Sequence, residues 1–122
     1  MRDYHLSPAE KSFADVIWAN APLESSEMIR LGEEHFGWKR TTTYTVLKHL
    51  CGKNIFSLER GTVRALISRE DFYAGQSVEY VQQSFGGDLP AFLAAFTSKE
   101  KLKEEDICRL EQLIGEYRKE QA

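Results

Sequence analysis

The sequence predicts a mainly α-helical protein with one small β-hairpin. Six stretches space their apolar residues as a helix with one buried face would. One pair of short segments rich in β-branched and aromatic residues flanks a glycine turn, which is the pattern of a hairpin. At 122 residues and 42% hydrophobic content, the chain can bury a modest core. We therefore expect one small domain, or a compact domain that carries an extra assembly segment.

The first helix is expected over residues 8–20. Ser7 is a suitable N-cap, Pro8 suits the first turn, and Glu10 places a carboxylate at the third helical position. Pro22 cannot continue a helix, so it ends this one.

A short strand at residues 23–24 and a second helix over residues 26–36 follow. Ser25 or Ser26 can cap this helix, and Gly37 suits the left-handed conformation that ends many helices. We expect Trp38, an aromatic residue just before the next helix, to pack against these two helices.

The third helix is expected over residues 40–51 and has two different faces. The buried stripe comprises Thr43, Val46, Leu47, Leu50 and Cys51. The outward face is rich in hydroxyls and cations and comprises Thr41, Thr42, Thr45, Lys48 and His49, with Tyr44 at its border.

The hairpin is expected from residues 55–58 and 62–67, joined by a tight turn at Glu59, Arg60 and Gly61. Three helices followed by a hairpin is the order of a winged helix-turn-helix, in which the third helix enters the DNA major groove. The first half of the chain therefore predicts a winged-helix domain.

Three further helices are expected at residues 70–84, 88–96 and 103–120, with breaks at Gly86-Gly87 and at residues 97–101. The last two carry more apolar residues than they can bury alone, so we expect them to pack against a second copy of the chain. The residues expected in this dimer contact are Leu89, Phe92, Leu93, Phe96, Ile107, Leu110, Leu113, Ile114 and Tyr117. We place a winged-helix DNA-binding domain at residues 1–70 and a helical dimerisation domain at residues 71–122.

Positive charge is concentrated in one segment of an acidic chain. The net charge is -3, yet residues 38–64 hold six Lys or Arg against Glu59 alone, a local charge of +5. The potential near a surface follows local charge, so this segment suits a polyanion. The candidate DNA contacts are Lys39, Arg40, Thr41, Thr42, Thr45, Lys48, His49, Arg60 and Arg64. The alternative for each is an ordinary solvated side chain on a helix face or a turn.

The sequence gives little support for a metal-binding protein, an enzyme, a disulfide-linked protein or a membrane protein. No C-x-x-C or H-x-x-x-H pair suggests a metal site, and no glycine-rich phosphate loop or serine elbow suggests an enzyme. Cys51 and Cys108 are far apart within helical patterns, so a disulfide is not expected. No apolar run approaches the ~20 residues that cross a bilayer. We expect a cytoplasmic protein that is not an enzyme and needs no cofactor or metal.

Dispersed motifs resemble the penicillinase-repressor family, the BlaI, MecI and CopY group. They are Leu6-Ser7-x-Ala9-Glu10, Ile17-Trp18, Ala21-Pro22-Leu23, Trp38-x-x-x-Thr42-x-x-Thr45-x-Leu47 and Phe85-Gly86-Gly87-x-Leu89. The resemblance spans nearly the whole chain. It implies a bacterial homodimeric repressor with a winged-helix DNA-binding domain and a helical dimerisation domain.

The chain also departs from that family pattern. The family helix usually begins W-S-P-K-T, whereas Lys39 and Arg40 follow Trp38 here, and His49 stands where an arginine is common. These departures imply a different operator. The family's antibiotic-resistance branch is cleaved at an Asn-Phe bond, whose nearest counterpart is Ala95-Phe96, and its copper branch ends in a cysteine cluster that is reduced here to Cys108. A sensor or protease of the inducing pathway is thus implied only by the resemblance, and copper sensing is disfavoured.

Two hypotheses follow. In the first, a homodimer represses transcription from an inverted-repeat operator. In the second, the chain is a winged-helix interaction module whose basic face binds an acidic protein and no DNA. Gel shift with the upstream DNA of its own gene separates them.

Overall fold

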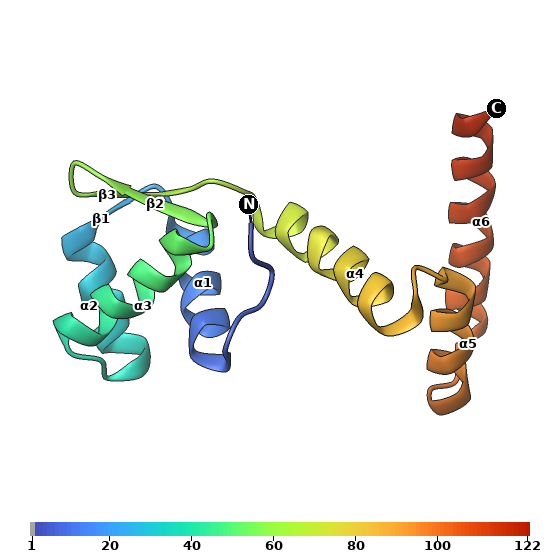
Figure 1. The fold of residues 1–122 in the computed structure, drawn as a ribbon, viewed down its shortest axis with the longest axis horizontal. Helices are drawn as coiled ribbons and strands as arrows, with labels where there is room; N and C mark the ends of the chain where they lie inside the picture. Colours follow the sequence, from blue (N-terminus) through green and yellow to red (C-terminus); the bar gives the residue numbers. More distant parts are fainter. Residues whose placement is uncertain (1) are drawn as a thin grey trace. The chain divides into compact units, whose positions relative to one another are not determined.

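A computed structural model describes residues 2–122 and contains six helices and a small antiparallel sheet within that range (Figure 1). The elements are α1 (Pro8–Asn20), β1 (Leu23–Glu24), α2 (Ser25–Phe36), α3 (Arg40–Gly52), β2 (Phe56–Glu59), β3 (Thr62–Ala65), α4 (Arg69–Phe85), α5 (Leu89–Lys99) and α6 (Glu104–Gln121). They form two compact units, one ending at Tyr80 and one spanning Val81–Ala122. The predicted fold class, a winged helix followed by a helical part, is confirmed.

The start of α1 is fixed by the predicted capping residues. The Ser7 hydroxyl accepts a hydrogen bond from the Glu10 backbone N–H at 3.1 Å, and the Glu10 carboxylate accepts one from the Ser7 N–H at 2.7 Å. This reciprocal capping box satisfies two N–H groups that the first turn of a helix leaves without acceptors.

A glycine allows α2 and α3 to approach closely. A Cβ atom on Gly32 would lie 2.6 Å from Thr43 Oγ1, and Thr43 is fully buried. At the end of α2, Gly37 adopts a φ of 69°, the left-handed conformation expected from the sequence. The helix-turn-helix angle therefore depends on glycine at both positions.

The sheet has the strand order β1-β3-β2 and is antiparallel throughout. β2 and β3 form the hairpin, in which Glu59 pairs with Thr62. The two residues between them, Arg60 and Gly61, have φ values of 53° and 78°, as a two-residue turn of type I′ requires. The hairpin turn is thus one residue tighter than the predicted one.

The core lies where α1, α2 and α3 meet the sheet. Its buried members include Phe13, Ile17, Met28, Leu47, Leu50, Ile55, Phe56, Val63 and Phe72. Trp38 stacks on Phe36 of α2 at 4.5 Å and lies 5.3 Å from the Phe13 ring of α1, as its place before α3 predicts. Phe72 of α4 is also fully buried here, so the first turns of α4 belong to this unit.

In the second unit, α5 extends further than the sequence indicates. The expected polar break at residues 97–101 begins instead at Glu100, whose N–H bonds to the Phe96 carbonyl. Thr97 and Ser98 are helical, and their hydroxyls donate to carbonyls three and four residues earlier, those of Leu93, Ala94 and Ala95. The helix therefore runs about one turn past Phe96, and its hydroxyl residues do not end it.

Candidate nucleic-acid interface

The outward face of α3 presents the predicted hydroxyl and basic side chains together. Lys39, Arg40, Thr41, Thr42, Thr45, Lys48 and His49 are all exposed, while Thr43, Leu47 and Leu50 point into the core. The Thr45 hydroxyl donates to the Thr41 carbonyl at 2.9 Å, which holds its side chain in one rotamer. The Arg40 guanidinium lies 5.6 Å from the centre of the Tyr44 ring and is partly ordered by that contact.

The amino-terminal end of α3 offers free hydrogen-bond donors. Lys39 is the N-cap, and its side chain makes no capping hydrogen bond to the first turn. The N–H groups of the first turn consequently keep no acceptor within the helix, and such groups are well suited to phosphate oxygens. Lys39 and Arg40 add positive charge at the same end.

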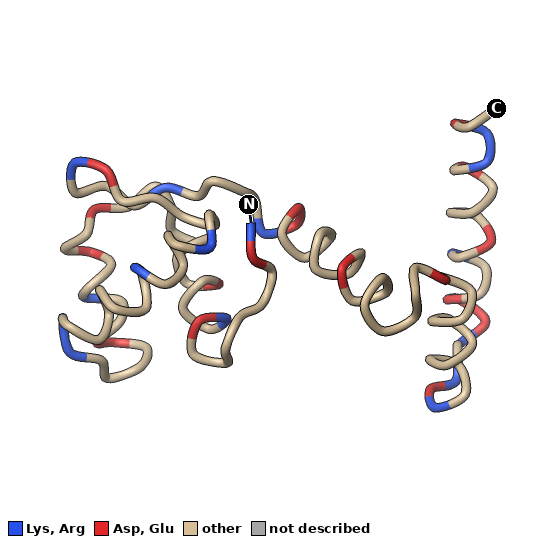
Figure 2. The backbone as a smooth tube through the Cα atoms, in the orientation of Figure 1, with Lys and Arg blue, Asp and Glu red and all other residues tan. Residues whose placement is uncertain are grey.

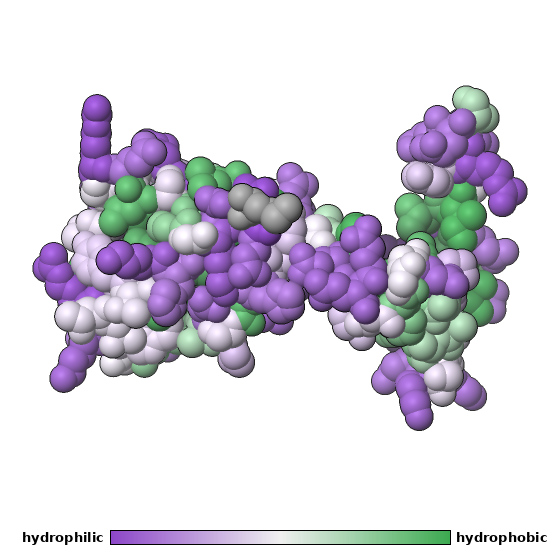
Figure 3. All heavy atoms as spheres, in the orientation of Figure 1, coloured by the Kyte–Doolittle hydropathy of each residue, from purple (hydrophilic) through white to green (hydrophobic). Residues whose placement is uncertain are grey.

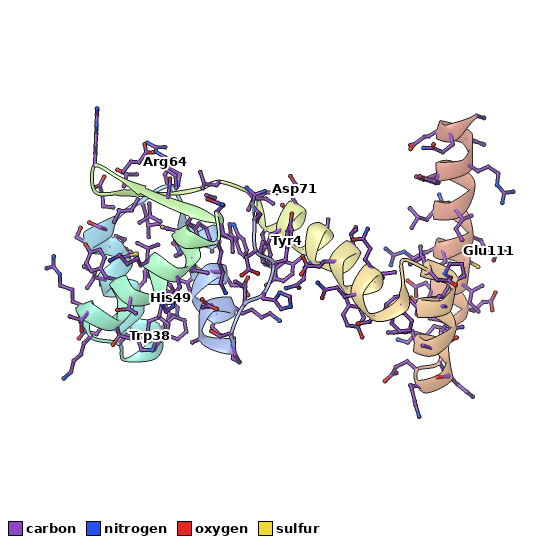
Figure 4. The ribbon with its side chains drawn as sticks, viewed as in Figure 1. Tyr4, Trp38, His49, Arg64, Asp71 and Glu111 are labelled. Atoms are coloured by element: carbon purple, nitrogen blue, oxygen red, sulfur yellow. The ribbon has the colours of Figure 1, made fainter. Side chains whose placement is uncertain are left out.

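The hairpin carries the two remaining basic candidates. Arg60 is at the tip, where Figure 2 shows a basic residue beside an acidic one, and Arg64 is on β3 opposite Ser57. Val63 is buried, so its neighbour Arg64 points to the outer face of the strand by the alternation of a β-strand. Figure 4 shows Arg64 on the hairpin and His49 on α3. The two arginines therefore add exposed positive charge on the hairpin, outside α3.

A shallow hollow of about 400 Å³ separates α3 from the hairpin. Its lining includes Thr45 and Lys48 from α3 and Leu58 from β2. Leu58 is 40% exposed although it is apolar. This surface thus combines a hydroxyl, an ammonium group and an apolar side chain, the groups that read base edges and thymine methyls in a major groove.

Lys53 contributes to the charge of +5 in residues 38–64 but does not belong to the exposed basic surface. Its ammonium group lies 3.0 Å from a Glu10 carboxylate oxygen and also donates to the His5 carbonyl. Its side chain is only 21% exposed. Lys53 therefore stabilises the fold and is not available to a phosphate, so the charge of +5 overstates what this surface can offer DNA.

Glu10 links the start of α1 to the end of α3. Besides Lys53, His49 approaches it, with His49 Nδ1 3.9 Å from a Glu10 carboxylate oxygen. Burial raises the pKa of the Glu10 carboxyl, but hydrogen bonds from the Ser7 N–H and from Lys53 outweigh burial, and the net pKa lies below its ordinary value of 4.5. His49 thus lies at the α1 edge of the outward face, beside the Glu10 carboxylate.

Glu10→Gln should destabilise the folded protein by about 1–2 kcal/mol at neutral pH, because it removes the charge that Lys53 faces. A depressed folded pKa stabilises the fold above the unfolded pKa, and this stabilisation is lost as pH falls through the folded value. The difference between the parent and the variant in urea unfolding should accordingly be constant above about pH 5 and shrink as the solution is acidified below it. A difference that stays unchanged at about pH 3 would show that the carboxylate charge does not stabilise the fold.

The predicted dimerisation residues all lie on α5 and α6. Leu89, Phe96, Ile107, Leu113, Ile114 and Tyr117 are exposed, and Phe92, Leu93 and Leu110 are half-buried. Several of them line a hollow of about 610 Å³ between the two helices, including Phe92, Phe96, Leu110 and Leu113. The structure therefore brings Phe92, Leu93, Phe96, Leu110 and Leu113 together around one hollow.

Within residues 2–122, no group of three or more His, Cys, Asp or Glu side chains is placed to hold a metal ion. Both cysteines are free thiols; burial raises the pKa of Cys51, while Cys108 is exposed. None of the described helices is both long enough and apolar enough to span a bilayer.

Sequence reasoning missed the segment that precedes α1. Residues 2–5 carry no motif, but Tyr4 packs its ring against Phe72 with centroids 5.2 Å apart. Its only sequence signal is the apolar spacing of Tyr4 and Leu6 ahead of the Ser7 cap, which is too short to predict a contact with residue 72.

Two comparisons relate this chain to known proteins. A family model described as "Penicillinase repressor" matches residues 6–116, which include both units. The penicillinase repressor of Bacillus licheniformis is 24% identical over 117 residues, covering 93% of this chain and 91% of that protein. The match covers α3 and α5 in full and α6 as far as Glu116, so the chain belongs to the penicillinase repressor family of DNA-binding transcriptional repressors.

Proposed function

We propose that two copies of this chain bind an inverted-repeat operator and repress transcription by blocking access of the polymerase. Each copy places α3 in the major groove, and its hairpin follows the flanking phosphate backbone. Residues 1–70 make the DNA contacts, and residues 71–122 hold the two copies together.

The observation that carries the DNA-binding proposal is the single exposed face of α3. Thr42, Thr45 and Lys48 project from it, next to a helix end with free N–H donors. Contacts to phosphate position a protein on DNA, and contacts to base edges provide sequence preference. The amino-terminal end of α3 suits contacts to phosphate, and the side chains further along α3 suit contacts to base edges. One helix can therefore make both kinds of contact. Arg60 and Arg64 add backbone contacts from the hairpin.

The helical part supports the homodimer. No residue of α5 or α6, both fully described helices, is buried. Figure 3 shows apolar surface over these two helices, where a folded monomer would expose it to water. A hydrophobic surface of this kind marks an interaction site, and a second copy supplies a matching one by twofold symmetry.

Selection of duplexes from a random-sequence pool tests the proposal without knowledge of the operator. The parent protein should enrich inverted repeats whose half-sites lie one or two helical turns apart, and it should be dimeric by light scattering. Leu113→Glu introduces a charge into the apolar surface and should yield a monomer that has lost at least tenfold in affinity for the enriched duplex. Gln121→Glu adds the same charge at the end of α6 and should change neither property.

Failure to enrich any duplex, together with salt-insensitive binding of an acidic protein, would instead support the protein-interaction module. A dimeric Leu113→Glu variant would show that the apolar surface of α5 and α6 is not the contact between the copies.

A further inference from the structure

The segment before α1, residues 2–6, runs alongside the first turns of α4 and is here called the N-terminal strap (Figure 1). One side of it is attached to the end of the recognition helix α3. The Asp3 N–H donates to the Lys53 carbonyl at 3.2 Å, and Arg2 Nε donates to the Asn54 carbonyl at 2.9 Å. In return the Lys53 ammonium donates to the carbonyl of His5.

The other side of the strap is attached to α4. Besides the ring contact between Tyr4 and Phe72, Gln76 Nε2 donates to the Tyr4 carbonyl at 2.9 Å, and His5 Nδ1 lies 3.4 Å from a Glu79 carboxylate oxygen. Figure 4 shows Tyr4 against the start of α4, close to Asp71. The strap thus connects the helix proposed to read DNA with the helix through which the chain leaves the winged-helix unit.

Because Gly75 has no side chain, the Tyr4 ring can pack directly on the backbone of α4. A Cβ atom at position 75 would lie 2.4 Å from Tyr4 Cε1 and Cζ and 2.5 Å from its hydroxyl oxygen. Real Cβ atoms do not approach a ring so closely, so any larger residue would push Tyr4 off α4. Glycine inside a helix lowers its stability, and the close fit of the Tyr4 ring is a reason for its presence here.

The strap lengthens the part of α4 that is held. The direct contacts between α4 and α1 lie in the first turns of α4, where Arg69 pairs with Asp15 and Phe72 packs on Trp18. The strap adds Gln76 and Glu79, about 10 Å further along the helix axis than Arg69 and Phe72 on average. A rod held over a longer distance tilts less. Over the ~25 Å length of α4, a tilt of about 10° moves the far end by about 4 Å, close to one base-pair step.

We propose that the N-terminal strap is a positioning element that sets the separation of the two recognition helices in the dimer. The Tyr4 ring fixes the direction of α4, and Gly75 provides the space that this ring occupies. The proposal rests on the homodimer proposed above. In this proposal the strap makes no contact with DNA, so it governs how the two half-sites are spanned together and leaves the reading of each half-site unchanged.

Gly75→Ala tests this inference with the full-length protein. The probes are the inverted repeat that the parent enriches from a random pool, the same duplex cut to one half-site, and versions with one base pair inserted or removed at the centre. The variant should lose roughly tenfold in affinity for the intact repeat and less than about twofold for the single half-site. It should also discriminate less than the parent between the three spacings. Gly115→Ala is the matched control, because it makes the same change in α6, outside α3 and the strap, where an added Cβ meets nothing within 4 Å.

A double-mutant cycle with Tyr4→Ala shows whether the effect passes through the ring. Tyr4→Ala should reproduce the loss, Gly75→Ala should add nothing in that background, and Tyr4→Phe should retain parental spacing preference. Should Gly75→Ala fail to fold in a thermal unfolding measurement, Tyr4→Ala provides the same comparison.

Equal losses on the intact repeat and on the half-site, or no loss on either, would overturn the positioning role while leaving the proposed function intact. A parent that enriches no inverted repeat would instead refute the proposed function on which the inference rests.

Discussion

Operator binding should weaken by about ten-thousandfold when the salt concentration rises from about 50 to about 200 mM. Five basic side chains of each copy are exposed on α3 and the hairpin: Lys39, Arg40, Lys48, Arg60 and Arg64. If four of them contact phosphate, the dimer displaces about eight condensed counterions, and the slope of log affinity against log salt is about -7. Fluorescence anisotropy with the enriched duplex measures this slope.

Arg60→Ala should reduce the size of that slope by about two, because each of the two copies loses one phosphate contact. Its effect on affinity should be similar across related operator sequences, since a phosphate contact carries no sequence information. Arg118→Ala removes the same charge from the exposed end of α6 and should leave the slope unchanged. A slope that Arg60→Ala does not alter would remove the hairpin tip from the DNA contacts.

Phe72→Ala should destabilise the protein by about 3–5 kcal/mol, a large part of the 5–15 kcal/mol that stabilises a typical domain. Phe72 is fully buried, and its ring contacts those of Tyr4, Trp18 and Tyr73 at centroid distances between 5.2 and 5.4 Å. Truncation leaves a cavity between α1, α4 and the strap, and these elements cannot all collapse into it.

Urea unfolding checks this prediction. Leu66→Ala is the control, because Leu66 is also apolar but is 51% exposed, so its truncation should cost less than about 1 kcal/mol. A loss of less than about 1 kcal/mol for Phe72→Ala would show that α4 is not part of the core of the first unit.

Local sequence signals located most of the elements, because each signal acts within a few residues. Ser7 and Glu10 form the capping box that their spacing predicts, and Gly37 ends α2 in the left-handed conformation. The hairpin follows from a glycine turn between two β-branched segments. The end of α5 was predicted incorrectly, since the hydroxyls of Thr97 and Ser98 can bond within a helix as well as end one.

The sequence by itself determined the order of the elements, the buried stripe of α3 and hence the identity of its exposed face. Periodicity and capping are short-range properties, and they do not depend on where distant residues lie. Only the tertiary structure decided which charges are free and which are paired. The Lys53 ammonium donates to Glu10, 43 residues away in the chain, and the Tyr4 ring packs on Gly75 of α4. Such contacts depend on the packing of α1, α3 and α4 around one core, and that packing leaves the face of α3 free while it places the strap against α4.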